Sequence, residues 1–447
     1  MKKLLLSTVA LVGMTSGAMA GGLDRSGQGT GAIFNENGAT SFSFGVVNPS
    51  INAADTGTAT TYSPAESYTQ IGATYTREVN DQLSMTLVFD QPFGAAVNYD
   101  APQATSSFGG TKADISTNAI SMYGRYKVNG NVSVFGGLRL QQAQGDVALG
   151  GQSYNAGFAA GAAEQLIAGF FAGGGRPATL SEQVVQGAAA GNAAAVAAYD
   201  GTIAGNAALA AFLGGANPAG LNVDTAADVQ TLAGASIAGG GYTVDIESSY
   251  GVGYSIGAAY EIPDIALRAA ITYHSGITHD TSATEQNAII TSGAASTNDI
   301  EFETPQSINL DFQTGIAADT LLTASVRWAE WGAFDVTPAR INTDLADLGD
   351  SYSYRLGVAR RFSDELAGSV TLSYEDASNS GVSPLGPTDG LIGLTVGLRY
   401  ETDDAILSGG VNYTIPGDAD LTAGGNTFAR STDNSVVGVG FQAQWSF

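Results

Sequence analysis

The last thirteen residues of the chain, "SVVGVGFQAQWSF", alternate between apolar side chains and small or polar ones. Successive side chains of a β-strand point to opposite faces, so this period of two predicts a strand with one apolar face. That face would carry Val437, Val439, Phe441, Ala443, Trp445 and Phe447. A chain end is usually polar and frayed, so an apolar stripe ending in large aromatic residues indicates a strand in an apolar environment.

The same alternation recurs in segments such as "IALRAAITYH", "LLTASVRW", "LAGSVTLSYE" and "LIGLTVGLRY". Each spans about ten residues, the length that a tilted strand needs to cross a bilayer. One face is apolar and often ends in an aromatic residue, whereas the other carries Gly, Ser, Thr or Arg. Alternation alone fits both a soluble sandwich, whose apolar faces pack together, and a membrane barrel, whose apolar face meets lipid.

The connections between these segments favour the barrel, because short and long ones alternate. The short turns hold Asn, Asp or Pro, which form tight hairpins, and lie at 80–82, 129–131, 263–264, 317–320, 363–365 and 402–404. The long connections lie at 50–65, 92–112, 148–239, 284–298, 338–350, 379–388 and 417–432. We therefore predict an all-β transmembrane antiparallel β-barrel of about 14 strands with both ends of the chain on the periplasmic side.

The N-terminus has the pattern of a secretory signal peptide over residues 1–20. Lys2 and Lys3 precede an apolar run, and Ala18-Met19-Ala20 has the small residues of a cleavage site. After this segment no run of 18 apolar residues occurs, which excludes a helical membrane protein. We expect the mature chain to comprise residues 21–38 and a barrel over 39–447, without disulfides because cysteine is absent.

The formal net charge is −25, or −27 without Lys2 and Lys3. Such acidity excludes nucleic acid as a partner, since that partner needs a basic face. It fits acidic exposed loops on an exported protein, and it equally fits a simple requirement for solubility.

The connection at 148–239 differs from the others, because it is rich in Ala and Gly and its apolar residues have helical spacing. We expect two short helices over the barrel mouth, in a loop long enough to be functional or disordered. Its candidate contacts with a hydrophobic substrate are Phe158, Leu166, Phe170, Phe171 and Phe212.

Nearly the whole mature chain resembles the FadL/TodX family of outer-membrane channels for long-chain fatty acids and other hydrophobic molecules. The resemblance is clearest in "FDQPFGAAVNY", "NAISMYGRYKVNGNVSVFGGLRL", "ETPQSINLDFQTGI" with "SVRWAEWGAFDV", and "SYSYRLGVARRFSDELAGSVTLSYEDAS". It implies a 14-stranded barrel, an N-terminal hatch in the lumen over residues 21–38, and a third strand that kinks inward and opens the wall. The family's Asn-Pro-Ala hatch motif is missing here, and the nearest match, Asn48-Pro49-Ser50, lies beyond the first strand.

The residues of the third strand give this kink a physical basis. Pro92 has no N–H to donate to a neighbouring strand, and Gly94 adopts backbone angles that other residues do not. The alternative interpretation is that Pro92 begins an outer loop. The candidate residues of a lateral opening are Phe89, Gln91, Pro92, Phe93 and Gly94.

Arg139, Arg327 and Arg355 fall on polar strand faces and are expected to point into the lumen. There a guanidinium group could bind a carboxylate head group, or form an ion pair with a lumen Asp or Glu. The family's basic contacts to fatty-acid carboxylates have no evident match in this chain. His274 and His279 lie five residues apart, hence on opposite faces of a regular strand, and suggest neither an enzyme nor a metal site.

The sequence therefore predicts a passive channel for hydrophobic molecules, such as long-chain fatty acids or aromatic hydrocarbons, in the outer membrane of a Gram-negative bacterium. We expect no cofactor, a monomer, lateral exit at Pro92, and membrane lipids and the outer-membrane assembly machinery as partners. Two alternatives remain open: a general porin for polar solutes, and a structural or adhesive surface barrel.

Overall fold

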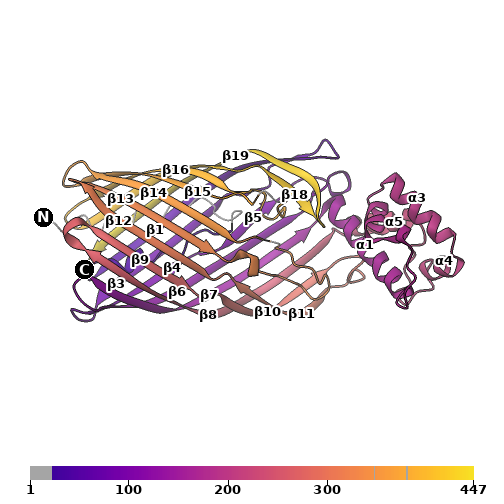
Figure 1. Cartoon of the computed structure of the whole chain (residues 1–447), viewed down its shortest axis with the longest axis horizontal. Coiled ribbons are helices and arrows are strands. Elements are labelled where there is room, and N and C mark those ends of the chain that lie inside the picture. Colours follow the sequence, from indigo (N-terminus) through magenta and orange to yellow (C-terminus); the bar gives the residue numbers. More distant parts are fainter. Residues whose placement is uncertain (1–22, 347, 379–380, 447) are drawn as a thin grey trace.

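A closed β-barrel with a helical lobe at one end forms the molecule (Figure 1). This computed structural model describes residues 23–346, 348–378 and 381–446, so the predicted signal peptide and Phe447 lie outside it. The last strand pairs with the first from Ala39 opposite Ser446 to Asp55 opposite Ala429, and this pairing closes the barrel.

The wall consists of fourteen staves, each of which is one crossing of the barrel wall. Nine staves are single strands: β1 (Ala39–Asp55), β6 (Lys112–Lys127), β7 (Val132–Leu149), β8 (Tyr242–Ile262), β13 (Thr320–Ala329), β14 (Ser351–Arg361), β15 (Leu366–Glu375), β16 (Leu391–Glu401) and β19 (Asn426–Ser446). Five staves consist of two segments: β2 (Thr61–Tyr62) with β3 (Tyr68–Glu78), β4 (Leu83–Asp90) with β5 (Gly94–Asn98), β9 (Leu267–His274) with β10 (Ile277–Gln286), β11 (Ser296–Thr304) with β12 (Ser307–Ala317), and β17 (Ala405–Pro416) with β18 (Ala419–Ala423). The predicted 14-stranded antiparallel barrel is confirmed.

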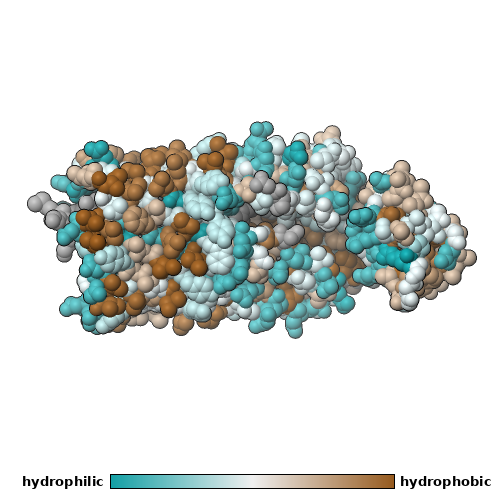
Figure 2. Space-filling view, in the orientation of Figure 1, coloured by the Kyte–Doolittle hydropathy of each residue, from teal (hydrophilic) through white to brown (hydrophobic). Residues whose placement is uncertain are grey.

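A band of exposed apolar side chains surrounds the half of the barrel that lies away from the helices (Figure 2). On β8 it runs from Tyr250 to Tyr260 and occupies every second position. On β19 it includes Val437, Val439 and Phe441, as the alternation predicted. A soluble protein rarely exposes so much continuous apolar surface, so the band is the surface that faces lipid.

Short and long connections separate to opposite ends of the barrel, as predicted. The six short turns follow β3, β6, β8, β12, β14 and β16. The long connections lie at the other end, where the helical lobe stands (Figure 1). The last strand ends among the short turns, which places the C-terminus on the periplasmic side.

The helical lobe contains five α-helices in the described residues, not the two that we predicted. They are α1 (Gly151–Phe170), α2 (Glu182–Ala189), α3 (Ala193–Ala204), α4 (Ala207–Leu213) and α5 (Ala226–Ala238). The side chains of Asn192, Asn206 and Thr225 accept hydrogen bonds from the first turns of α3, α4 and α5. Each of these N-caps begins a new helix, although the spacing of the apolar residues alone does not show where one helix ends and the next begins.

The lobe has its own apolar core, which includes Ile167, Leu180, Tyr199 and Leu209. No described helix is both long and apolar enough to cross a membrane alone. Taken together, α3 and α4 have the length and apolar composition of a membrane span, but the chain bends by 110° between them. Short 3₁₀ helices complete the structure: η2 (Gly31–Phe34), η3 (Gln103–Thr105), η4 (Ala178–Leu180), η5 (Pro263–Ile265) and η6 (Trp331–Ala333).

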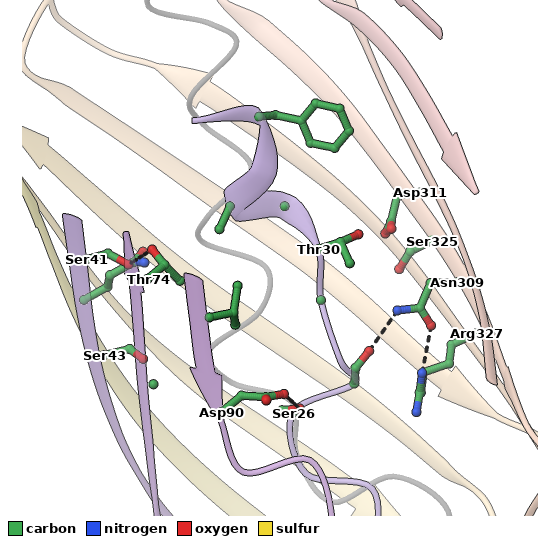
Figure 3. A pocket seen from close by; sticks show the side chains of 18 of the residues that line it. Ser26, Thr30, Ser41, Ser43, Thr74, Asp90, Asn309, Asp311, Ser325 and Arg327 are labelled. Carbon is green, nitrogen blue, oxygen red and sulfur yellow. Dashed lines mark hydrogen bonds between the residues drawn. The ribbon is translucent and has the colours of Figure 1, made fainter. Parts of the chain in front are cut away.

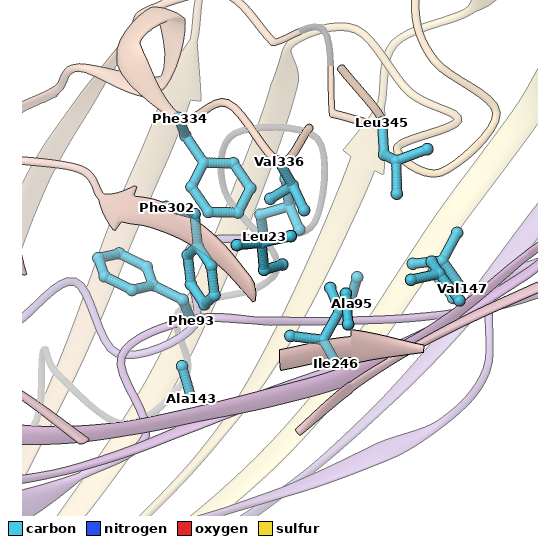
Figure 4. Packing of buried hydrophobic residues seen from close by; sticks show 14 of the residues in the cluster. Leu23, Phe93, Ala95, Ala143, Val147, Ile246, Phe302, Phe334, Val336 and Leu345 are labelled. Carbon is cyan, nitrogen blue, oxygen red and sulfur yellow. The ribbon is translucent and has the colours of Figure 1, made fainter. Parts of the chain in front are cut away.

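Two segments occupy the barrel interior. The N-terminal segment, Leu23–Gly38, lies in the periplasmic half among polar side chains of the lumen. The connection between β13 and β14 folds inward from the outer end and buries Trp331, Phe334 and Val336 in an apolar cluster (Figure 4). The inserted connection thus packs in an apolar cluster, whereas the N-terminal segment binds polar side chains of the wall.

Candidate functional site

The third stave breaks inside the wall, between β4 and β5. Asp90 lies opposite Ala119 of β6, and the next pair is Gly94 opposite Ser116, so the stave carries one extra residue. Pro92 sits in this bulge and donates no hydrogen bond. Because β5 continues the pairing with β6 beyond Pro92, this proline does not begin an outer loop.

The break leaves a gap on the side of β3. Pairing between β3 and β4 ends at Ala73 opposite Phe89. Main-chain bonding across this seam resumes where Glu66 N–H donates to the carbonyl of Ala96, at 2.9 Å. Between these points the described residues form no main-chain hydrogen bond across the seam. We call this interruption the wall gap.

The extra residue turns Phe93 into the lumen. Its side chain is buried and packs edge-on against Trp331, with ring centroids 5.2 Å apart. Leu23 lies in the same apolar cluster (Figure 4). The kink therefore contacts both the N-terminal segment and the inserted outer loop.

The N-terminal segment also pairs with the kink through main-chain groups. Arg25 N–H donates to the carbonyl of Pro92 at 2.8 Å, and Gly94 N–H donates to the carbonyl of Leu23 at 2.9 Å. A Cβ at Gly94 would lie 2.7 Å from the carbonyl oxygen of Ile115, which is closer than atoms tolerate. Glycine is required here because two backbones approach closely.

A cavity of about 250 Å³ lies beside the N-terminal segment and reaches the lower edge of the wall gap. Polar side chains line it toward the lumen, among them Ser26, Thr30, Asp90, Asn309, Asp311, Ser325 and Arg327 (Figure 3). Its apolar lining residues include Phe44, Ile71, Val88 and Phe89. The cavity thus presents both polar and apolar side chains.

The three predicted arginines all point into the barrel, but their surroundings differ. Arg327 donates to the carboxylate of Asp24 at 2.6 Å and to the amide oxygen of Asn309 at 2.8 Å. The carboxylate of Asp24 in the N-terminal segment therefore balances the charge of Arg327. Arg139 is 2% exposed and interacts electrostatically with Asp90, whereas Arg355 lines the cavity.

Phe34 of the N-terminal segment also lines this cavity. Its ring lies between two guanidinium groups, 4.5 Å from that of Arg125 and 4.2 Å from that of Arg268. Arg125 forms an ion pair with Glu261. The positive groups face the negative faces of the ring, a favourable arrangement in a site with little water.

A cleft of about 1750 Å³ separates the helical lobe from the barrel rim. Phe158 and Leu166 of α1 line this outer cleft, together with Ile290 and Leu345. The other three predicted contacts, Phe170, Phe171 and Phe212, form an aromatic group elsewhere in the lobe and do not line the cleft. The structure therefore separates the predicted capture residues into two groups.

The spacing of His274 and His279 had predicted that they lie on opposite faces of the wall, and this prediction is wrong. Both side chains are buried in the barrel interior. The stave is interrupted at Ser275-Gly276, between β9 and β10, and this interruption resets the alternation. Within the described residues no three His, Cys, Asp or Glu side chains are grouped in a way that could hold a metal ion.

Sequence reasoning missed Asp24, Phe34 and Trp331. The first two precede the first strand, where no periodicity indicates which side chains are buried. Trp331 follows β13 and would read as an exposed loop residue, because nothing in the local pattern shows that the loop folds inward.

Comparisons with known proteins agree with this architecture. Residues 40–447 match the family described as outer membrane protein transport protein (OMPP1/FadL/TodX). No curated protein matches the chain.

Among solved structures, a FadL homologue from Pseudomonas aeruginosa is similar, with a TM-score of 0.61 at 12% identity over 98% of this chain and 99% of that one. The toluene transporter TodX from Pseudomonas putida gives 0.57 at 13% identity over 96% and 98%. The toluene transporter TbuX from Ralstonia pickettii gives 0.54 at 12% identity over 96% and 97%. At such identities the likeness concerns the fold alone.

Proposed function

The chain belongs to the FadL/TodX family of outer-membrane transport proteins, and we propose that it is a passive channel that releases hydrophobic small molecules sideways through the wall gap. Its place is the outer membrane of a Gram-negative bacterium, and its relatives are transport channels rather than enzymes. The substrate and the sideways route are our proposals.

The observation that carries the proposal is the wall gap. The seam between β3 and the third stave lacks main-chain hydrogen bonds from Ala73 to Glu66. In lipid an unpaired backbone group is costly, so an unpaired seam in a membrane wall calls for a functional reason. We propose that Phe34, which contacts two arginines, obstructs the straight route to the periplasm.

The outer half of the molecule supports capture of an apolar molecule. The outer cleft presents Phe158 and Leu166, and the apolar cluster around Trp331 and Phe93 continues from the barrel mouth to the kink. Burial of apolar surface stabilises a bound hydrophobic molecule by about 25 cal/mol per Å². We propose that the substrate moves along this apolar path and needs no energy source.

The cavity supports a substrate with one polar end. Arg355 and Asp311 line its inner side and Phe89 its wall side. A cavity of about 150 Å³ can hold benzene, so this one has room for an aromatic ring or a short part of an acyl chain. Arg355 and Arg327 line the cavity and are the candidate contacts there for an acidic head group, whereas Arg139 is buried outside the cavity lining.

Uptake by vesicles that contain the purified protein tests the proposal. We expect a labelled fatty acid or aromatic hydrocarbon to enter faster than in protein-free vesicles, and a polar sugar to enter at the protein-free rate. Rapid sugar entry, or large steady pores in planar bilayers, would instead support a general porin. An absence of transport for either solute would favour the surface barrel.

A further inference from the structure

The Gln91 side chain bridges the wall gap and takes the place of a main-chain bond. Its Oε1 accepts a hydrogen bond from Ile71 N–H of β3, at 2.9 Å. Its Nε2 donates to Oδ1 of Asn118 of β6, at 3.1 Å. One amide group thus connects both neighbouring staves across the bulge.

These partners are the residues that Gln91 would face in a regular strand. Ala73 lies opposite Phe89, so the same register two residues further places Ile71 opposite Gln91. On the other side Asp90 lies opposite Ala119, and one step further places Asn118 opposite Gln91. The side chain therefore supplies a link to Ile71 beyond the last paired residues of β3 and β4, and adds a side-chain link to β6.

The neighbouring main-chain groups of the bulge are bound elsewhere. The carbonyl of Pro92 accepts from Arg25 and Ser26 of the N-terminal segment. Phe93 N–H donates to Oγ1 of Thr117 of β6, at 2.8 Å. The bulge is thus fixed to the lumen and to β6, and Gln91 is its one hydrogen-bonded link to the adjoining part of β3, Tyr68–Gly72, in the described structure.

We propose that Gln91 is a latch, a side-chain rung whose release opens the wall gap to lipid. A main-chain rung breaks only if a strand separates, whereas a side chain leaves by rotation about its own bonds. The free Ile71 N–H would be costly in lipid, so the closed state is favoured until a molecule in the gap displaces the amide. This inference rests on the proposed sideways route and names the residue that controls it.

Hydrogen exchange at the Ile71 amide tests the latch without any transport measurement. We expect Gln91→Leu, which removes the acceptor, to speed this exchange about tenfold. Gln91→Glu retains an acceptor and is expected to leave the exchange near the wild-type rate. Equal protection in wild type and Gln91→Leu would overturn the latch, and so would a Gln91→Glu variant as unprotected as Gln91→Leu.

A reversible lock tests whether release of the latch opens the route. The natural chain has no cysteine, so Ile71→Cys with Gln91→Cys can be joined by a short bis-methanethiosulfonate. This reagent forms a disulfide with each thiol, releases a sulfinate each time, and is cleaved by a reducing agent. We expect the joined protein to lose most uptake of a labelled hydrophobic probe by vesicles and to regain it on cleavage. The matched control is Tyr75→Cys with Leu87→Cys, an outward-facing pair across the intact seam and outside the cavity, which should transport alike in both states.

Gln91→Leu is expected to carry the probe several-fold faster than wild type. Full transport by the joined 71/91 variant would overturn the latch but would leave the proposed function as a hydrophobic channel intact. A wild-type protein that carries no hydrophobic probe would instead refute the proposed function, and the exchange measurement at Ile71 keeps these two failures apart.

Discussion

At the scale of single residues, buried charges hold the N-terminal segment in the lumen. Arg327 and Asp24 are 8% and 2% exposed, and the same guanidinium also binds Ser307 and Asn309. A buried charge without its partner is strongly unfavourable, so this pair fixes the upper part of the segment. The Phe34 ring between Arg125 and Arg268 fixes the lower part.

Asp24→Asn is expected to weaken this attachment by about 3 kcal/mol, because it leaves the Arg327 charge buried without its anion. Hydrogen exchange over residues 23–38 would measure the loss. The control is Asp420→Asn, whose partner Arg430 is 63% exposed and whose effect should stay within about 1 kcal/mol. Equal exchange in the two variants would contradict an anchoring role for Asp24.

Phe34→Ala is expected to make the lumen leak small ions. The substitution removes two cation–π contacts of about 1 kcal/mol each and the ring that fills the space between the arginines. Planar bilayers would show new conductance events, whereas Phe34→Tyr, which retains an aromatic ring, should behave as wild type. A silent Phe34→Ala channel would mean that other residues seal the periplasmic end.

At the scale of elements, the helical lobe is an insertion between two paired strand ends. Leu149 lies opposite Tyr242, so β7 and β8 would form a hairpin if the lobe were absent. The lobe core consists mainly of its own residues. The barrel therefore does not need the lobe to close.

Replacing residues 150–241 by Asn-Gly, which favours a two-residue hairpin turn, is expected to leave a folded barrel. Uptake of a hydrophobic probe at low concentration should fall several-fold, because the outer cleft with Phe158 and Leu166 is lost. At a saturating concentration of the probe, the variant and the wild type should take it up at similar rates. The wild-type rate at low concentration would contradict a capture role for the lobe.

The closing strand gives a prediction about assembly. In β19, Trp445 pairs with both Thr40 and Ala405, so its last residues complete the barrel beside the periplasmic turns. Phe447→Asp is expected to reduce the amount of heat-modifiable folded protein in the outer membrane, because the alternation of the sequence predicts a lipid-facing side chain here and a charge at such a position opposes insertion. Normal amounts of folded barrel would show that the terminal aromatic residue is dispensable.

At the scale of the whole molecule, periodicity together with the alternation of short and long connections predicts the barrel, its strand number and the end at which each turn lies. These features follow from local rules, since alternation and turn residues are visible within about ten residues. Pro92 likewise marks the bulge from its own chemistry. The arginines of the lumen follow from their position on polar strand faces.

Contacts between distant segments were not predictable in this way. The hydrogen bond between Gln91 and Ile71 depends on where the extra residue interrupts the pairing of the third stave. The edge-on contact of Phe93 with Trp331 depends on a loop that folds inward. The five helices of the lobe depend on caps at Asn192, Asn206 and Thr225 rather than on the apolar pattern. Each of these features is set by three-dimensional packing that no short window of sequence contains.

The position of the wall gap relative to the apolar band decides where a released molecule arrives. On β6 the outward side chains are apolar at Ile120 and Met122, but they are charged at Lys112 and Asp114. Gln91 meets β6 at Asn118, between these two zones. In the proposed route the cargo thus enters the upper edge of the outer leaflet. The protein would carry it past the polar surface of the cell, and diffusion between the two leaflets would complete the crossing.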